Sequence, residues 1–193
     1  MKVGVLALQG DIAAHARALV DAGAEAQLVR VPGDLAGIEA LVLPGGESTA
    51  MLRGLERDGL EPALRAFLES GRPVLGTCAG AILLAREVRG PAQRSLAAVD
   101  ISIERNAYGT QADSFVCTAE TDDPDSPFAG LECVLIRAPR IVRVGEDVKV
   151  HARVKSEPAL VASGRIWAAI FHPELTRDTR VQRAWLGSAA SGT

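Results

Sequence analysis

Residues 74–85, VLGTCAGAILLA, join two apolar runs through a pair of glycines that flank Cys78. The first run, over residues 74–76, is typical of a buried strand, and the second, over residues 81–85, is typical of a buried helix. A sharp turn between them lifts the Cys78 side chain above a sheet, because small neighbours let the backbone turn tightly. The same turn places Cys78 at a helix N-terminus, where the helix dipole favours a thiolate.

The alternation of strand and helix continues toward the N-terminus. We expect strands over residues 2–8, 27–31 and 39–43, and helices over residues 12–23, 49–56 and 60–70. The first strand is apolar on both faces, as in parallel strands that helices cover on both sides. This order predicts the α/β fold class, with a doubly wound, mostly parallel sheet.

The second half of the chain consists of shorter, alternating segments. We expect strands over residues 99–103, 114–117, 134–137, 148–150, 159–161 and 167–171, and a last helix from about Thr179. No linker interrupts the chain, so we expect one domain over residues 1–193. The small residues from about Gly187 onward predict a disordered tail.

Composition and charge narrow the possible functions. The 193 residues are 48% hydrophobic and carry a net charge of −3, so neither nucleic acid nor an anionic membrane is an expected partner. No signal peptide or membrane span is evident, which predicts a cytoplasmic protein. The three cysteines are odd in number and widely spaced, so we expect neither a disulfide framework nor a metal site.

A nucleophilic thiol needs a base, and the chain has three histidines. We expect His15 to be a surface or satisfied residue in the middle of a helix, and His151 to be exposed. His172 ends the apolar strand 167–171, at the carboxyl edge where open α/β sheets place their sites. The proline after His172 keeps the chain extended, so Glu174 can hold one imidazole nitrogen while the other faces Cys78.

Each of these motifs has a simpler structural explanation when it is taken alone. A cysteine is most often a small buried apolar residue, and His172 with Glu174 can belong to a turn with a surface carboxylate. When both motifs lie at one edge of a sheet, they favour a catalytic set in which Cys78 is the nucleophile, His172 the base and Glu174 the residue that orients the base. The backbone N–H of Ala79 is then one donor to an oxyanion.

A second glycine turn, at residues 43–49, also follows a buried strand and precedes a helix. Gly45 and Gly46 let the backbone approach a ligand, so this turn can supply a second oxyanion donor and a seat for a small polar substrate. The spacing does not match a phosphate-binding loop. The alternative is a tight turn in which Ser48 caps the helix.

Taken together, these motifs resemble the triad-type, or class I, glutamine amidotransferases, and among them the glutaminase subunits of pyridoxal 5′-phosphate synthase. Further similar segments are residues 4–10, 43–49, 104–106, 113–115, 136–139 and 171–176. The resemblance covers nearly the whole chain. It implies a flavodoxin-like three-layer α/β sandwich that needs no cofactor and no metal.

The resemblance also implies a role for each site residue. Cys78 would be the nucleophile, His172 the general base and acid, and Glu174 its orienter. The implied glutamine-binding positions are Gly46, Glu47, Ser48, Arg105, Ile136 and Arg137. An arginine suits this role because its fork can bind the α-carboxylate of glutamine with two hydrogen bonds.

A partner is implied as well: the synthase subunit that builds pyridoxal phosphate from two sugar phosphates and ammonia, typically with twelve copies of each chain. The length of the chain independently supports the expectation of a partner, because the motifs account for a glutaminase and leave no segment for an ammonia-using domain. The resemblance further implies that the oxyanion loop is completed only on docking. We therefore expect low activity from the isolated chain.

Three alternatives stay open. The chain could be a glutaminase of another pathway, such as histidine or purine synthesis, although residues 9–11 and 104–106 argue against it. It could be a cysteine peptidase or chaperone-like relative, which would ignore glutamine analogues. It could also be a non-catalytic regulatory subunit, which the presence of Cys78, His172 and Glu174 disfavours.

Overall fold

The computed structural model describes residues 1–105 and 114–190. Its central sheet has seven strands in the order β10-β11-β12-β4-β3-β1-β2. Five neighbouring strands are parallel: β12 (Ile166–Ala169), β4 (Val74–Thr77), β3 (Ala40–Leu43), β1 (Lys2–Leu6) and β2 (Glu25–Val29). The antiparallel strands β11 (Glu157–Ser163) and β10 (Lys149–Val154) extend one edge.

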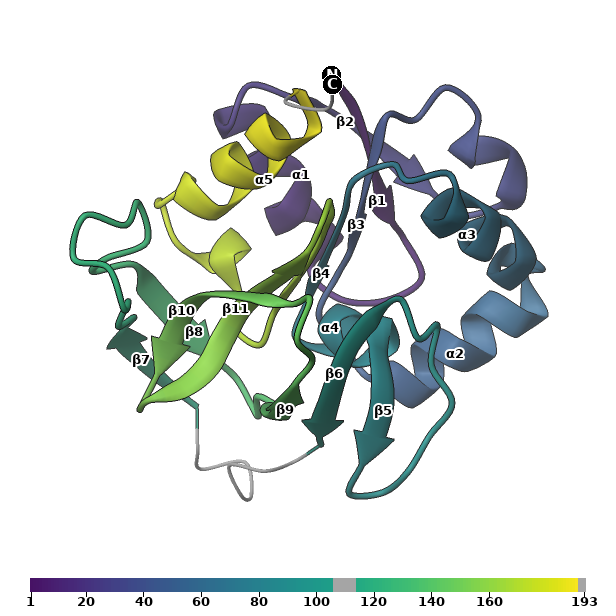
Figure 1. Cartoon of the computed structure of the whole chain (residues 1–193). Helices are drawn as coiled ribbons and strands as arrows, with labels where there is room; N and C mark the ends of the chain where they lie inside the picture. Colours follow the sequence, from purple (N-terminus) through teal and green to yellow (C-terminus); the bar gives the residue numbers. More distant parts are fainter. Residues whose placement is uncertain (106–113, 191–193) are drawn as a thin grey trace.

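Helices cover both faces of this sheet (Figure 1). Helices α1 (Ile12–Asp21) and α5 (Arg180–Ala190) lie on one face, and α2 (Ser48–Arg57) and α3 (Leu60–Glu69) on the other. The short helix α4 (Ala79–Leu84) packs beside α2 and against β3, β4 and β12. The α/β class with a mostly parallel central sheet is therefore confirmed.

Burial explains the apolar runs of the first half. Every residue of β3 and of β4 is buried, because each strand has parallel neighbours on both sides and helices above and below. Side chains from both halves of the chain join one continuous apolar core.

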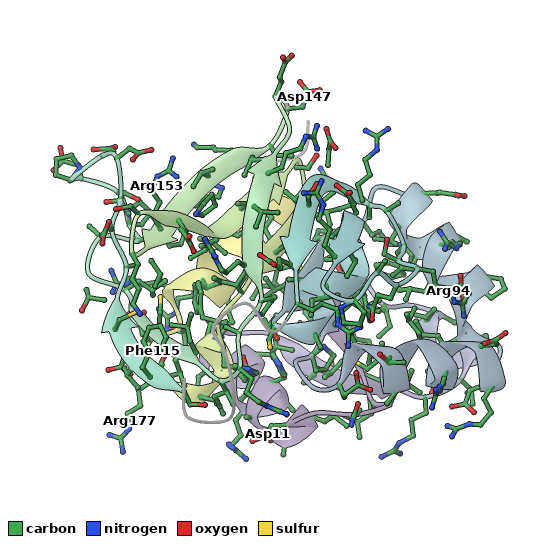
Figure 2. All side chains as sticks on the ribbon, turned by 90° about the horizontal axis from the view of Figure 1, so that it is seen from below. Asp11, Arg94, Phe115, Asp147, Arg153 and Arg177 are labelled. Carbon is green, nitrogen blue, oxygen red and sulfur yellow. The ribbon has the colours of Figure 1, made fainter. Side chains whose placement is uncertain are left out.

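The parallel strands bring four loops to one edge of the sheet. The loops after β1, β3, β4 and β12 all leave from carboxyl ends, and the labelled strand β1 runs downward toward this edge in Figure 1. Figure 2 shows the molecule from below, with Asp11 labelled in the loop after β1. This edge is where sites form in open α/β sheets.

Two smaller sheets flank the same end of the molecule. One contains β5 (Ala85–Arg89), β6 (Val99–Glu104) and β9 (Arg140–Val144), and the other pairs β7 (Phe115–Thr118) with β8 (Glu132–Leu135). Strands β5 and β9 were not predicted, because their charged residues weaken the apolar signal of a strand. The remaining elements are the short 3-10 helices η1 (Pro32–Leu35) and η2 (Pro173–Leu175).

Several predicted boundaries were wrong. The helix expected at residues 81–85 begins directly after Cys78 and ends at Leu84, and residues 136–137 lie beyond the end of β8. Helix α5 continues through Gly187 to Ala190, so a tail does not begin at Gly187. Within the similar segments 104–106 and 113–115, residues 106 and 113 lie outside the described residues.

Candidate active site

Cys78 occupies a strained turn between β4 and α4. Its φ of 48° and ψ of −104° are unusual for a residue with a side chain, and its N–H donates to the Ala169 carbonyl at 2.8 Å. The flanking glycines are required by close backbone contacts: a Cβ on Gly80 would lie 2.0 Å from the Leu43 oxygen, and one on Gly76 would lie 2.7 Å from Gly80. Helix α4 therefore sits tightly on the sheet and presents Cys78 at the edge.

His172 and Glu174 lie together beside Cys78. His172 Nδ1 is 2.7 Å from Glu174 Oε1, so Nδ1–H donates to the carboxylate. The Nε2 nitrogen is left for Cys78, and interaction with the Cys78 side chain is one of the causes that raise the pKa of His172. The backbone N–H of His172 donates to the Val134 carbonyl at 2.9 Å, which fixes the start of η2. The sequence-predicted trio is thus brought together.

The surroundings of His172 and Glu174 favour an ion pair between a protonated His172 and an ionised Glu174. Burial raises the pKa of Glu174, but hydrogen bonds from His15 and His172 outweigh it and lower that pKa to about 2. Burial lowers the pKa of His172, but its bonds to Cys78 and Glu174 outweigh this and raise the pKa to about 10. Both pKa directions favour an imidazolium at His172 beside an ionised Glu174 carboxylate.

His15 belongs to this cluster, a role that was not predicted for it. It is 3% exposed, and its Nε2 lies 3.2 Å from Glu174 Oε1 and 3.2 Å from Thr77 Oγ1. Of the two positions expected for His15, on the surface or satisfied within the fold, the structure shows the second. The spacing of His15, Ala18 and Leu19 does carry a signal, because residues at i, i+3 and i+4 share the buried face of a helix.

The glycine turn after β3 packs directly against His172. A Cβ on Gly45 would lie 2.4 Å from His172 Cε1, so only glycine fits there without displacing the ring. The loop after β1 also contacts this turn. Gln9 Oε1 accepts from the Glu47 N–H at 3.0 Å, and a Cβ on Gly10 would lie 2.0 Å from the Gly45 oxygen.

Glu47, rather than Ser48, caps α2. The Glu47 carboxylate accepts from the N–H groups of Thr49 and Ala50 at 3.0 and 2.7 Å. Ser48 is buried and donates instead to Gln93 Oε1 at 3.1 Å. Arg105 Nη2 lies 3.3 Å from Glu47 Oε1, so the cap also holds an arginine of the predicted glutamine site.

One cavity contains Cys78 and all six predicted glutamine-binding residues. Its lining is Gly46, Glu47, Ser48, Cys78, Ile82, Arg105, Ile136, Arg137 and Pro139. Ile82 and Pro139 were not predicted. Arg137 is exposed at the rim of the cavity and has a left-handed φ of 45°, so the backbone turns sharply at this residue. Ala79 opens α4, so its N–H has no acceptor within the helix.

The other two cysteines lie away from this cavity. Cys117 and Cys133 face each other across β7 and β8, and neither forms a disulfide. Burial raises the pKa of the Cys117 thiol and raises that of Cys133 to about 12, so both are poor nucleophiles at neutral pH.

His151 is half-buried rather than exposed. Its ring stacks on Trp167 with centroids 4.6 Å apart, and burial followed by the charge of Lys149 lowers its pKa to about 4. It therefore packs as a neutral ring and lies outside the cavity of Cys78.

Residues 1–105 and 114–190 contain neither a cluster of metal ligands nor a membrane-spanning helix. No group of three or more histidine, cysteine or acidic side chains could hold a metal ion there. No helix in this part of the chain is long and apolar enough to cross a membrane.

Comparisons with known proteins identify the family of this chain. A model described as the SNO glutamine amidotransferase family matches residues 5–189. The chain is 48% identical over 194 residues to "Pyridoxal 5'-phosphate synthase subunit PdxT" of Deinococcus radiodurans, covering 98% of this chain and 97% of that protein. It is 43% identical over 189 residues to the protein of the same name from Thermotoga maritima, covering 96% and 98%.

Solved structures show the same relationship. One described as "Crystal structure of glutamine amidotransferase" has a TM-score of 0.88 at 43% identity and covers 97% of this chain and 98% of its own. PurLQS from Thermotoga maritima has a TM-score of 0.67 at 19% identity over 96% and 97% of the two chains, and it supports the fold alone. The predicted resemblance is confirmed, and the chain belongs to the SNO glutamine amidotransferase family.

Proposed function

We propose that this chain is the glutaminase subunit of a pyridoxal 5′-phosphate synthase. It hydrolyses L-glutamine to L-glutamate and ammonia, and a synthase subunit receives the ammonia. Family membership and the names of relatives 43–48% identical over nearly their whole length support this assignment. The observation that carries it is the Cys78–His172–Glu174 arrangement, which opens onto a cavity lined by two arginines.

The first half of the reaction forms a thioester. The Cys78 thiolate attacks the side-chain amide carbon of glutamine, and the carbonyl oxygen becomes an oxyanion. The Ala79 N–H and an N–H of Gly45 or Gly46 hold this oxyanion. Protonated His172 gives its Nε2 proton to the amide nitrogen, the C–N bond breaks, and ammonia leaves.

The second half regenerates the enzyme. His172, now neutral, takes a proton from a water molecule, which attacks the thioester carbon. The C–S bond breaks and releases glutamate and the Cys78 thiolate, and His172 is protonated again. Glu174 stays ionised throughout, since its pKa of about 2 lies far below neutral pH. Its role is to orient His172 and stabilise the imidazolium.

Glutamine recognition rests on the residues around the cavity. Arg105 or Arg137 binds the α-carboxylate, and Glu47 is placed to meet the α-ammonium group. Ser48 and Ile136 complete the lining. The amide end of glutamine then points toward Cys78.

The partner is the synthase subunit, in an assembly of twelve copies of each chain. Ammonia is mostly protonated and unreactive in neutral water, so a glutaminase that works alone would waste glutamine. Docking around residues 9–11 and Glu47 would act directly on the oxyanion turn, because Gln9 already bonds to the Glu47 N–H.

The decisive experiment measures glutamate release from L-glutamine, with and without the synthase subunit, for the wild type and for Cys78→Ala. We expect release that depends on the synthase and is lost in Cys78→Ala. Cys117→Ala is the matched control and should keep full activity, since Cys117 lies outside the cavity.

Release that persists in Cys78→Ala would refute the mechanism. Activation by the glutamine-dependent partner of another pathway, and not by this synthase, would reassign the pathway. Full activity without any partner would contradict the proposed control by docking.

A further inference from the structure

We propose that His15 is a positioning residue for the triad, which holds the Glu174 carboxylate in the orientation that directs His172. This inference rests on the proposed function of the Cys78 site. His15 comes from α1, and His15, His172 and Glu174 meet at one oxygen atom of the carboxylate. Glu174 Oε1 lies 2.7 Å from His172 Nδ1 and 3.2 Å from His15 Nε2.

The geometry fixes the proton on His15. An ionised carboxylate only accepts hydrogen bonds, so Nε2 must carry hydrogen to lie 3.2 Å from Oε1. The Thr77 hydroxyl, also 3.2 Å from Nε2, is then a second acceptor for the same N–H. Thr77 directly precedes Cys78, so His15 also contacts the strand end that carries the nucleophile.

Glu174 needs support from outside its own segment. It lies in the three-residue helix η2, which is too short to hold a side chain by itself, and its side chain is 1% exposed. Its second oxygen, Oε2, has no hydrogen-bond partner among the described residues. The carboxylate is therefore held by two imidazoles at Oε1, and loss of His15 leaves it free to rotate or to take up a proton.

Helix α1 is well built to hold His15 in place. Asp11 caps the helix by accepting from the Ala14 N–H at 2.9 Å, and the His15 N–H donates to the Asp11 carbonyl. Ala14 and Leu19 are each 1% exposed against the core, so the buried face of the helix cannot turn. The position of His15 is thus set by packing, before any substrate binds.

Two variants of His15 test this role. His15→Leu fills the site without a donor, and His15→Gln keeps an N–H donor. With the synthase present, we expect His15→Leu to lower kcat about tenfold to a hundredfold, as a small misplacement of a catalytic group does, with KM for glutamine within about twofold. His15→Gln should recover most of the loss.

A second readout does not depend on glutamine. The rate of Cys78 alkylation by iodoacetamide at pH 7, resolved from Cys117 and Cys133 by peptide mapping, reports how well His172 supports the thiolate. We expect His15→Leu to slow it by a factor similar to the loss in kcat. His151→Leu is the matched control, because it removes an imidazole packed on Trp167, and it should leave the rate unchanged.

The same variants in a Glu174→Ala background decide whether His15 acts through Glu174. We expect His15→Leu to have no further effect on alkylation once the carboxylate is absent. An equal loss in both backgrounds would overturn the proposal, and so would a wild-type alkylation rate and kcat in His15→Leu. If His15→Leu fails to fold, a His15→Gln protein that folds but has lost kcat overturns it equally.

This design separates the two proposals. A wild-type protein that releases no ammonia with the synthase refutes the proposed function, and the alkylation rates still judge His15. If the wild type is fully active and His15→Leu changes neither kcat nor the alkylation rate, only the proposed role of His15 is refuted.

Discussion

The strained backbone of Cys78 is possible because three residues packed around it are glycines without side chains. The missing side chains of Gly76 and Gly80 let α4 press against the sheet, and the missing side chain of Gly45 lets the His172 ring come close. Strain of this kind persists only where the surroundings enforce it. The turn is therefore a property of the packing around Cys78 as much as of Cys78 itself.

At this scale the sharpest prediction concerns Gly45→Ala. The new methyl group would lie 2.4 Å from His172 Cε1, so the ring must move away from Cys78. We expect kcat for glutamine to fall about a hundredfold, the cost of a displacement of about 1 Å at a catalytic group. Glutamate release in the presence of the synthase measures it.

The matched control is Gly33→Ala. A Cβ on Gly33 meets no atom within 4 Å, and its backbone does not need glycine. We expect unchanged kcat and unchanged stability. A Gly45→Ala protein with wild-type kcat would show that the ring position inferred for His172 is wrong.

The buried Glu174 carboxylate predicts a pH dependence of stability. Its pKa falls from the ordinary 4.5 to about 2 on folding, so the unfolded chain binds the proton more tightly. The carboxylate stabilises the fold fully above about pH 4.5, and this contribution is lost as the pH falls toward 2. Between pH 5 and 3, the free energy of unfolding should therefore fall more steeply in the wild type than in Glu174→Gln.

Urea unfolding at several pH values in that range makes the comparison. The difference between the two slopes has an upper limit of about 1.4 kcal/mol per pH unit, the value of one proton. Parallel curves for the two proteins would mean that Glu174 does not ionise with a lowered pKa in the folded state.

At the scale of the elements, α2 links stability to substrate binding. Glu47 caps the helix with two hydrogen bonds and holds Arg105, while it also lines the cavity. We expect Glu47→Ala to lower the free energy of unfolding by about 1 kcal/mol, the usual value of a cap, and to raise KM for glutamine. Urea unfolding and initial rates measure the two effects.

Asp34→Ala is a suitable control for this pair of effects. Asp34 also accepts from two backbone N–H groups, those of Arg30 and Val31, and it lies outside the cavity. We expect it to lose stability with KM unchanged. A Glu47→Ala protein that loses stability but keeps its KM would confine Glu47 to the role of a cap.

At the scale of the whole molecule, the prediction is an assembly. Mixed with the synthase subunit, the 20.2 kDa chain should form a complex with twelve copies of each protein. Native mass spectrometry gives the stoichiometry, and the same sample gives the glutaminase rate. A complex with unequal numbers of the two chains, or one without increased activity, would contradict the proposed arrangement.

The sequence by itself determined the parallel core and the motif residues of the site, whereas Ile82 and Pro139 joined the cavity only in the folded chain. Buried strands such as β3 and β4 show as continuous apolar runs, and the glycines around Cys78 mark the turn that the chain needs there. The motif residues meet because parallel strands bring their carboxyl ends to one edge. These features are local in the chain, which is why a linear pattern carries them.

Only the tertiary structure decided which side chains meet across the fold. His15 and Glu174 are 159 positions apart, and their contact exists because α1 and η2 pack together. Cys117 and Cys133 face each other for a similar reason, since the register of β7 and β8 aligns them. Burial and hydrogen-bond partners depend on contacts between distant segments, and for that reason the environment of His15, the cap of α2 and the pKa of Glu174 emerged only from the folded chain.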